Sequence, residues 1–226
     1  GVKLAGNMAA SAGDIQIDAN GKLSMAQVAA SGSVVSVADS LDANGKIYAG
    51  NNINAQVEGE LRNQQSLAAR NSITLTADKL VNRDVVEAGV NPDGSRNATG
   101  NLSVTARELY NRDATFAASQ QLQIKASETL DNQGGTLSAG SQANVIGVSL
   151  DNRGGRVLAQ GALTVTADAL NNSSEGLVYG KQRVTVQAGA LDNRAGQISS
   201  QGQAQVSATS LDNRQGSLVS ESAMTV

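Results

Sequence analysis

Apolar and polar residues alternate along most of the chain, in short runs with a period of two. The clearest runs read apolar-x-apolar-x-Ala and lie at residues 73–77, 102–106, 122–126, 163–167, 184–188 and 204–208. Period two places the apolar side chains on one face of a β-strand and Thr, Ser, Gln or Lys on the other. Earlier copies of this strand are predicted at 15–17, 35–37 and 53–55. A helical stripe with a period of 3.6 fits none of these windows.

A Leu-x-Asn triplet recurs eight times between these strands. Its leucines stand at 61, 80, 109, 130, 150, 170, 191 and 211, in steps of 19, 29, 21, 20, 20, 21 and 20 residues. A degenerate copy, Leu41-Asp42-Ala43-Asn44, lies 20 residues before the first. A fixed period near 20 indicates a solenoid, in which each repeat forms one coil stacked on the next.

A second strand is predicted five residues after each Asn, where a large apolar residue is followed two positions later by a small one. The large residues are Phe116, Leu137, Val157, Leu177, Ile198 and Leu218. Two strands in each coil predict an all-β fold, a parallel β-helix of about ten coils that is on the order of 45–50 Å long at ~4.8 Å per coil. A β-sandwich is the alternative, but it does not require residue identities to recur at this fixed spacing.

The repeat predicts a single domain over residues 1–226, with degenerate repeats at 1–59 and regular repeats at 60–226. The chain begins at Gly1 without an initiator Met, and residues 223–226 match the start of an incomplete strand. Because a solenoid needs capping at a free end, we expect the chain to be a fragment of a longer protein.

The Asn of the triplet is the first candidate site. Its copies are Asn63, Asn82, Asn111, Asn132, Asn152, Asn172, Asn193 and Asn213. An Asn at a coil corner can hydrogen-bond the turn backbone, and stacked Asn amides can donate to one another as a ladder. We therefore expect this column to have a structural role. A row of metal ligands is the alternative, but amides alone are poor ligands and no ordered set of carboxylates accompanies them.

Charged residues flank the triplet. Asp occupies its middle position at 131, 151, 192 and 212, and Arg follows the Asn at 83, 112, 153, 194 and 214. Opposite charges in neighbouring columns offset the repulsion between like charges along the stack. We expect solvated pairs that stabilise the coils weakly.

The single long step of 29 residues holds nine more than the regular spacing, and the insertion is predicted near residues 89–98. This segment contains the only proline, in the turn sequence Asn91-Pro92-Asp93-Gly94, and Arg96 follows it. These residues form a candidate partner-binding loop, because loops on rigid scaffolds often carry function. Insertions in surface loops are also well tolerated, so a loop without a partner is the alternative.

Composition narrows the chemistry further. Aromatic residues make up 2 % of the chain, and Cys and His are absent. The formal net charge of −3, without a clustered basic face, argues against nucleic-acid binding. No apolar run reaches the about 20 residues of a transmembrane helix. Without His or a grouped set of carboxylates, we predict no catalytic, cofactor-binding or metal-ligating residues, and no enzyme activity.

The pattern L-[DN]-N-[RQ]-x-G, followed by apolar-x-[AS] and L-x-V-x-A, resembles the haemagglutinin repeats of filamentous haemagglutinin. The resemblance is close at residues 130–135, 150–155 and 191–196, and it covers 60–226 well and 1–59 more loosely. It implies a right-handed parallel β-helix, secreted by the two-partner route and exposed on a Gram-negative surface. The implied partner is an outer-membrane transporter, which would act through an amino-terminal region outside this chain. The resemblance brings no catalytic residues.

Such repeats also build the stalk of contact-dependent growth inhibition toxins. The leading hypothesis is therefore a rigid extracellular stalk that presents distal binding or toxic domains. The alternative is direct adhesion to glycans or a receptor on a host or neighbouring cell, through the 89–98 loop or the outward polar columns. A β-helical polysaccharide lyase is ranked lowest, because the acidic residues lie at corners and are not grouped on a strand face.

Overall fold

The computed structural model describes residues 1–226, and its regular elements are all β-strands in two sheets. The long sheet contains β1 (Val2–Leu4), β3 (Ile15–Met25), β5 (Val34–Ala43), β7 (Ile53–Val57), β8 (Glu60–Asn63), β10 (Ile73–Asn82), β12 (Leu102–Tyr110), β14 (Leu122–Asp131), β16 (Ala143–Asp151), β18 (Ala162–Asn171), β20 (Arg183–Asp192), β22 (Gln203–Asp212) and β24 (Met224–Thr225). The short sheet contains β2 (Met8–Ala10), β4 (Val28–Ala30), β6 (Ile47–Ala49), β9 (Ser66–Ala69), β11 (Val85–Ala88), β13 (Thr115–Ala118), β15 (Thr136–Ala139), β17 (Arg156–Ala159), β19 (Leu177–Gly180), β21 (Gln197–Ser200) and β23 (Ser217–Ser220).

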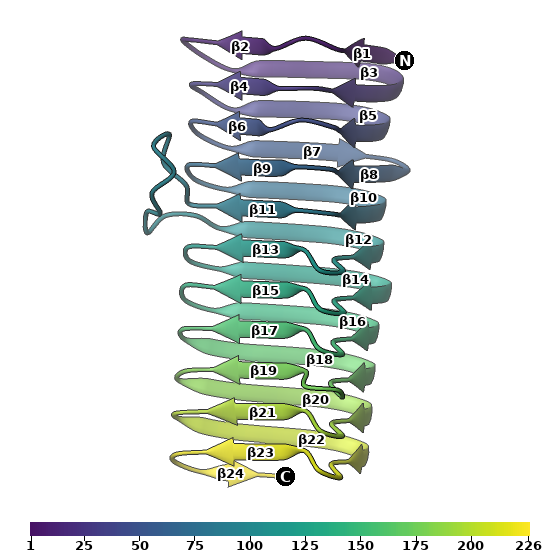
Figure 1. The fold of residues 1–226 in the computed structure, drawn as a ribbon, viewed down its shortest axis with the longest axis vertical. Helices are drawn as coiled ribbons and strands as arrows, with labels where there is room; N and C mark the ends of the chain where they lie inside the picture. The colour runs from purple at the N-terminus through teal and green to yellow at the C-terminus, as the bar shows by residue number, and fades with distance from the viewer.

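The two sheets are the walls of a right-handed parallel β-helix (Figure 1). Each strand pairs in parallel with its counterpart one coil earlier and one coil later, as β10 does with β7 and β12. The short sheet has one strand in each coil and eleven strands in all, so the rod has about eleven coils. At ~4.8 Å per coil the rod is about 50 Å long. The fold predicted from the repeat is confirmed.

Each long strand bends once, so the long sheet covers two faces of the rod. In β10, Ala77 and Leu80 face inward while both residues between them, Asp78 and Lys79, face outward. Two consecutive outward residues mark a corner, because a straight strand would alternate. The β7–β8 break shows the same corner at residues 58–59. We call the part of the long sheet after this bend the triplet face, since it carries the Leu-x-Asn triplets.

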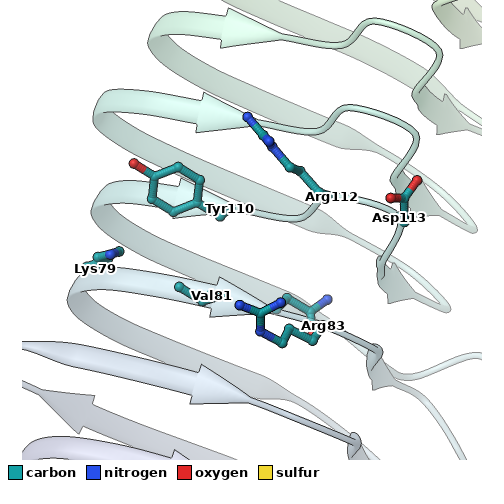
Figure 2. Close-up of a pocket in the computed structure, with 7 residues that line it drawn as sticks. Lys79, Val81, Arg83, Tyr110, Arg112 and Asp113 are labelled. Atoms are coloured by element: carbon teal, nitrogen blue, oxygen red, sulfur yellow. The ribbon is translucent and has the colours of Figure 1, made fainter.

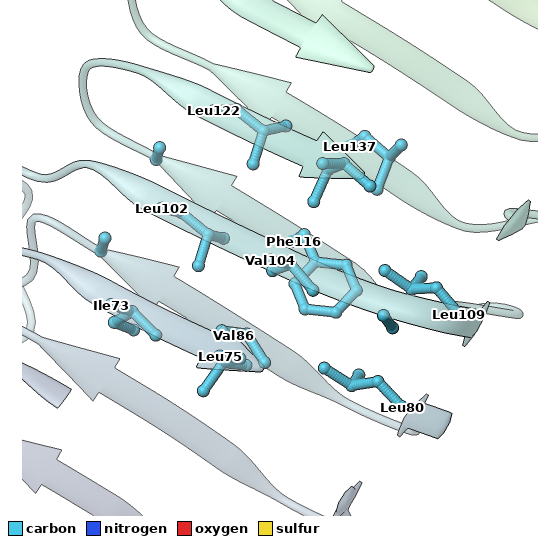
Figure 3. Close-up of a cluster of buried hydrophobic side chains, with 14 of the residues drawn as sticks. Ile73, Leu75, Leu80, Val86, Leu102, Val104, Leu109, Phe116, Leu122 and Leu137 are labelled. Carbon is cyan, nitrogen blue, oxygen red and sulfur yellow. The ribbon is translucent and has the colours of Figure 1, made fainter. Parts of the chain in front are cut away.

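The core is a continuous apolar column along the rod. It contains 53 buried residues in one cluster. Leu75 and Val104 of the long sheet point toward Val86 and Phe116 of the short sheet, and all four are 0 % exposed (Figure 3). Phe116, the only Phe, is the largest fully buried side chain. Stacked Leu, Val, Ile and Ala therefore fill an interior that leaves little room for aromatic rings.

The inward-facing positions predicted for the strand at 35–37 were wrong by one residue. Val34 and Ser36 face inward, at 1 % and 3 % exposure, while Val37 is 41 % exposed. Val34 pairs with Ile15, and Ser36 pairs with Ile17, so the neighbouring rung sets this register. Val34 and Val35 are both apolar, so the local sequence does not decide which of them faces inward, and a one-residue slip exchanges the two faces.

The inward residue predicted at Leu177 was also wrong. Val178 fills that position at 0 % exposure and pairs with Val157, whereas Leu177 pairs with the outward Arg156. The turn after Asn172 is one residue longer than its neighbours, and both Ser174 and Glu175 have positive φ. The extra turn residue moves the inward position from five to six residues after the Asn.

Candidate functional site

Eight side-chain amides stack in one row where the triplet face ends. They are the predicted residues Asn63, Asn82, Asn111, Asn132, Asn152, Asn172, Asn193 and Asn213. In the first seven, Nδ2 donates to Oδ1 of the next Asn along the chain, over 2.6–2.8 Å. The first seven are at most 2 % exposed. Each Nδ2 also donates to a carbonyl of its own turn, as Asn132 does to Gly135 at 3.2 Å.

The row has a direction and two different ends. Upstream, Ala43 occupies the position before Asn63, so the buried Oδ1 of Asn63 has no donor. Asn44 of the degenerate triplet is exposed instead and donates to Ser24 Oγ at 2.9 Å. Downstream, Asn213 is only partly buried. The amide row is therefore a property of the coils from Asn63 onward.

In the later coils the corner turn packs so closely against the amide row that its last residue is glycine. A Cβ added to Gly135 would lie 2.0 Å from Asn111 O, and Gly155, Gly196 and Gly216 are equally close to the Asn carbonyl one coil earlier. The residue before Gly135 has positive φ, at 62° in Gly134. In the Gly-Gly pair at this corner, the first glycine thus adopts a left-handed backbone conformation, and the second leaves free the space that a Cβ would fill.

Ion pairs line the outer side of the same corner. Arg153, Arg194 and Arg214 each hold the Asp of their own triplet, with Nη2 to Oδ2 distances of 2.6 Å. The hydrogen bond from Arg214 lowers the pKa of Asp212 to about 2, and the bond from Arg194 lowers the pKa of Asp192. These groups are partly exposed, so each pair adds little to stability.

The insertion forms an ordered loop on the edge of the rod opposite the bend, between β11 and β12 (Figure 1). Thirteen residues separate Ala88 from Leu102, whereas three separate their partners Ala69 and Ile73, so the insertion has ten residues and not nine. The spacing between triplets gave nine inserted residues, because the turn after Asn82 is one residue shorter than the turn after Asn111 and this difference hides one inserted residue.

The candidate partner residues are held by bonds within the loop. Asn91 N donates to Ser95 O at 2.8 Å, and Gly94 N donates to Asn91 O at 2.9 Å with φ of 82° at the glycine. Ser95 Oγ donates to Asp93 Oδ1 at 2.6 Å and Ser95 N donates to the same oxygen at 2.9 Å, and these two hydrogen bonds lower the pKa of Asp93. Exposed members of the loop include Pro92, Asp93, Gly94 and Arg96, whose guanidinium pairs with Glu87 at the loop base. The structure thus brings these residues together as a hairpin-like tip.

A depression that the sequence did not reveal lies on the triplet face, at its border with the corner (Figure 2). It encloses about 620 Å³, and Lys79, Val81, Arg83, Tyr110 and Arg112 line it. The signal in the sequence was an apolar and an aromatic residue, Val81 and Tyr110, in the middle of two successive triplets, where every other triplet has a charged residue or an amide.

No group of three or more His, Cys, Asp or Glu side chains lies close enough to hold a metal ion. None of the elements is a helix that is long and apolar enough to span a membrane.

Comparison with known proteins places this repeat in a family. The model of the haemagglutinin repeat matches residues 1–27, 10–91, 86–134, 121–181 and 175–226. The tRNA nuclease CdiA of Yersinia mollaretii is 30 % identical over 142 residues, which are 62 % of this chain but 5 % of that protein. No solved structure matches the chain. The chain therefore belongs to the haemagglutinin repeat family.

Proposed function

We propose that this chain is a rigid stalk segment of a large secreted bacterial adhesin or contact-dependent growth inhibition toxin. The observation that carries the proposal is the unbroken parallel pairing of every coil with the next, from β1 to β24 and from β2 to β23. Backbone hydrogen bonds run along the rod axis in both sheets, and the apolar core is continuous with them. Such a body resists bending and gives length in fixed increments of ~4.8 Å per coil.

Likeness to CdiA supports this context, since the chain matches a small part of a much longer protein. In that setting the segment is exported through an outer-membrane two-partner secretion transporter and lies at the cell surface. A cysteine-free chain whose contacts join neighbouring coils suits folding coil by coil after export. Binding or toxic domains at other positions of the parent protein would act on the target cell.

Whole-coil replacement in the parent protein tests the stalk function. Residues 132–171 span two coils, because Asn132, Asn152 and Asn172 occupy equivalent positions. Deleting them should leave the fold intact and shorten the stalk by about 10 Å. Exchanging them for two coils of another haemagglutinin repeat should preserve target-cell binding. Loss of binding on the exchange, with the protein folded and displayed, would contradict a purely structural role.

Direct adhesion is the second candidate, and the exposed tip around Pro92 favours it. Removing residues 89–98 from the parent protein separates the two functions. A stalk keeps its target-cell binding after this deletion, whereas an adhesin that binds through the tip loses it. The matched control deletes residues 132–151, one whole coil, which changes rod length without touching the loop.

A further inference from the structure

The triplet face carries one column of outward side chains that passes through the middle position of every triplet. In order along the rod, the column contains Arg62, Val81, Tyr110, Asp131, Asp151, Asn171, Asp192 and Asp212. From Asp131 onward its members are carboxylates or an amide. At Val81 and Tyr110, on adjacent rungs, the polar group is replaced by an apolar side chain and an aromatic ring.

This replacement leaves one arginine without a carboxylate. Arg153 pairs with the Asp of its own triplet, two residues earlier, and the same holds in two later coils. Arg83 stands at the same position of the repeat, but Val81 occupies the site of its Asp, and Arg83 makes no ion pair. Arg112 has Tyr110 two residues before it and pairs with Asp131 of the next coil instead.

The rungs of Val81 and Tyr110 enclose the depression on the triplet face. The turn after Asn82 has two residues before β11, whereas the turn after Asn111 has three before β13, so the second turn forms a ledge beside Arg83. Figure 2 shows Tyr110 and Arg112 on one rung and Val81 and Arg83 on the neighbouring one. The depression is thus lined by an apolar side chain, an aromatic ring and cations.

The polar groups around the ring are held in place. Lys79 Nζ lies 5.5 Å from the centroid of the Tyr110 ring. Tyr110 Oη donates to Glu108 Oε2 at 3.0 Å, and this hydrogen bond raises the pKa of Tyr110, so the phenol stays protonated at neutral pH. Asp113 is exposed at the rim, on the ledge, with φ of 52°. Its carboxylate can accept hydrogen bonds from hydroxyl groups.

We propose that this depression is a binding site for one acidic sugar residue, a pyranose that carries a single carboxylate. The ligand carboxylate takes the place of the missing Asp and accepts hydrogen bonds from Arg83, as Asp151 does from Arg153. The C–H face of the ring packs on Tyr110 and Val81. Ring hydroxyls donate to Asp113. That carboxylate repels a densely charged polyanion, so the site favours a sugar with one negative charge and free hydroxyls. A stalk needs no ligand, so the site is independent of the stalk function.

The test measures binding of methyl glucuronide to the chain by ligand-observed NMR, with methyl glucoside as the neutral matched probe and acetate as the carboxylate without a ring. We expect saturable binding of the glucuronide that is about 10-fold tighter than that of either control, because each control lacks one half of the recognition. Equal affinity for all three probes would overturn the proposal.

Val81→Asp is the most informative variant, because it restores the acidic residue of the repeat and gives Arg83 an internal partner. It should abolish glucuronide binding and leave the melting temperature unchanged or higher. Arg83→Gln should also abolish binding, and Tyr110→Ala should weaken it. Arg153→Gln removes an arginine at the same repeat position but with a paired Asp, and it should bind like the parent chain. Retained binding in Val81→Asp, or an equal loss in Arg153→Gln, would show that the depression is not the site.

Discussion

The coils before Asn63 and the coils from Asn63 onward share one backbone but differ at the corner. Both have parallel long strands in register, as β5 with β7 and β18 with β20. In the early coils, however, Met25 and Ala43 occupy the position of the buried Asn, and the strands of the short sheet have three residues instead of four. The coil therefore needs only the alternation of apolar and polar residues. The amide row is an addition that fixes one corner.

The difference predicts unequal effects of removing an Asn side chain. Asn132→Ala should lower the free energy of unfolding by about 2–3 kcal/mol, because it leaves the buried Asn152 without its counterpart and removes the donor–acceptor link from Asn111. Chemical denaturation with a CD readout measures this loss. Asn44→Ala is the matched control, since this Asn is exposed, and it should change stability by less than about 0.5 kcal/mol. Equal effects of the two substitutions would remove the distinction between the two regions.

Extending the amide row upstream should raise the stability of the rod, which tests the same comparison in the opposite direction. Ala43→Asn places an amide one rung before Asn63, whose buried Oδ1 lacks a donor. The turn has the same length there, because Ile47 pairs with Leu67. We expect a gain of about 1 kcal/mol in the free energy of unfolding. Asn63→Ala in the same background should cancel the gain, and a lower stability of Ala43→Asn alone would mean that Met25 already fills the space.

Period and residue identity predict the backbone of this protein well, and they do so for physical reasons. Each coil must place apolar residues at the same inward positions, so the strand at 73–77 and its later copies could be placed correctly from the sequence. Where two adjacent residues are both apolar, as at Val34 and Val35, only the neighbouring rung decides which of them faces inward, and that information is three-dimensional. The same limit applies at Leu177, where one extra turn residue shifts the frame.

The two candidate sites also differ in how far the sequence could predict them. Recurrence of the Asn pointed to the row of amides, because every copy performs the same local task. The depression depends on what is missing at Val81 and Tyr110 and on a turn that is one residue shorter than the next. A deviation of this kind has meaning only once the stacked rungs are known.

Low pH should affect the two regions differently, with a smaller effect than the substitutions. Hydrogen bonds from arginine lower the pKa of Asp192 and Asp212 in the folded rod, the latter to about 2. A lowered folded pKa means that the stabilisation is present above the unfolded pKa of about 3.9 and is lost as pH falls toward 2. Amide hydrogen exchange should show β20 and β22 opening more readily across this window. In Arg214→Gln the change near Asp212 should be flatter, and an identical pH profile would contradict the assignment.

Deletion of the inserted loop should have only a small effect on stability, although it removes ten residues. Without 89–98, Ala88 joins Thr99, and residues 99–101 form a three-residue connection like the one from Ala69 to Ile73 in the preceding coil. The deletion removes the hydrogen bond from Asn97 Nδ2 to Arg70 O, at 2.7 Å, and the exposed ion pair of Arg96 with Glu87. Shortening the connection offsets part of this cost, so the free energy of unfolding should change by less than about 1 kcal/mol, as measured by chemical denaturation.

The matched control for this deletion removes ten residues from within a coil. Without 112–121, the turn after Asn111 and the whole of β13 are absent, and β11 has no partner on that side. This variant should lose its cooperative unfolding transition, because the core column is interrupted at Phe116. Equal tolerance of both deletions would mean that the stability of the rod does not depend on the register between its coils. Tolerance of the first deletion alone would mean that the stacked coils provide the rigidity and that the loop does not contribute to it.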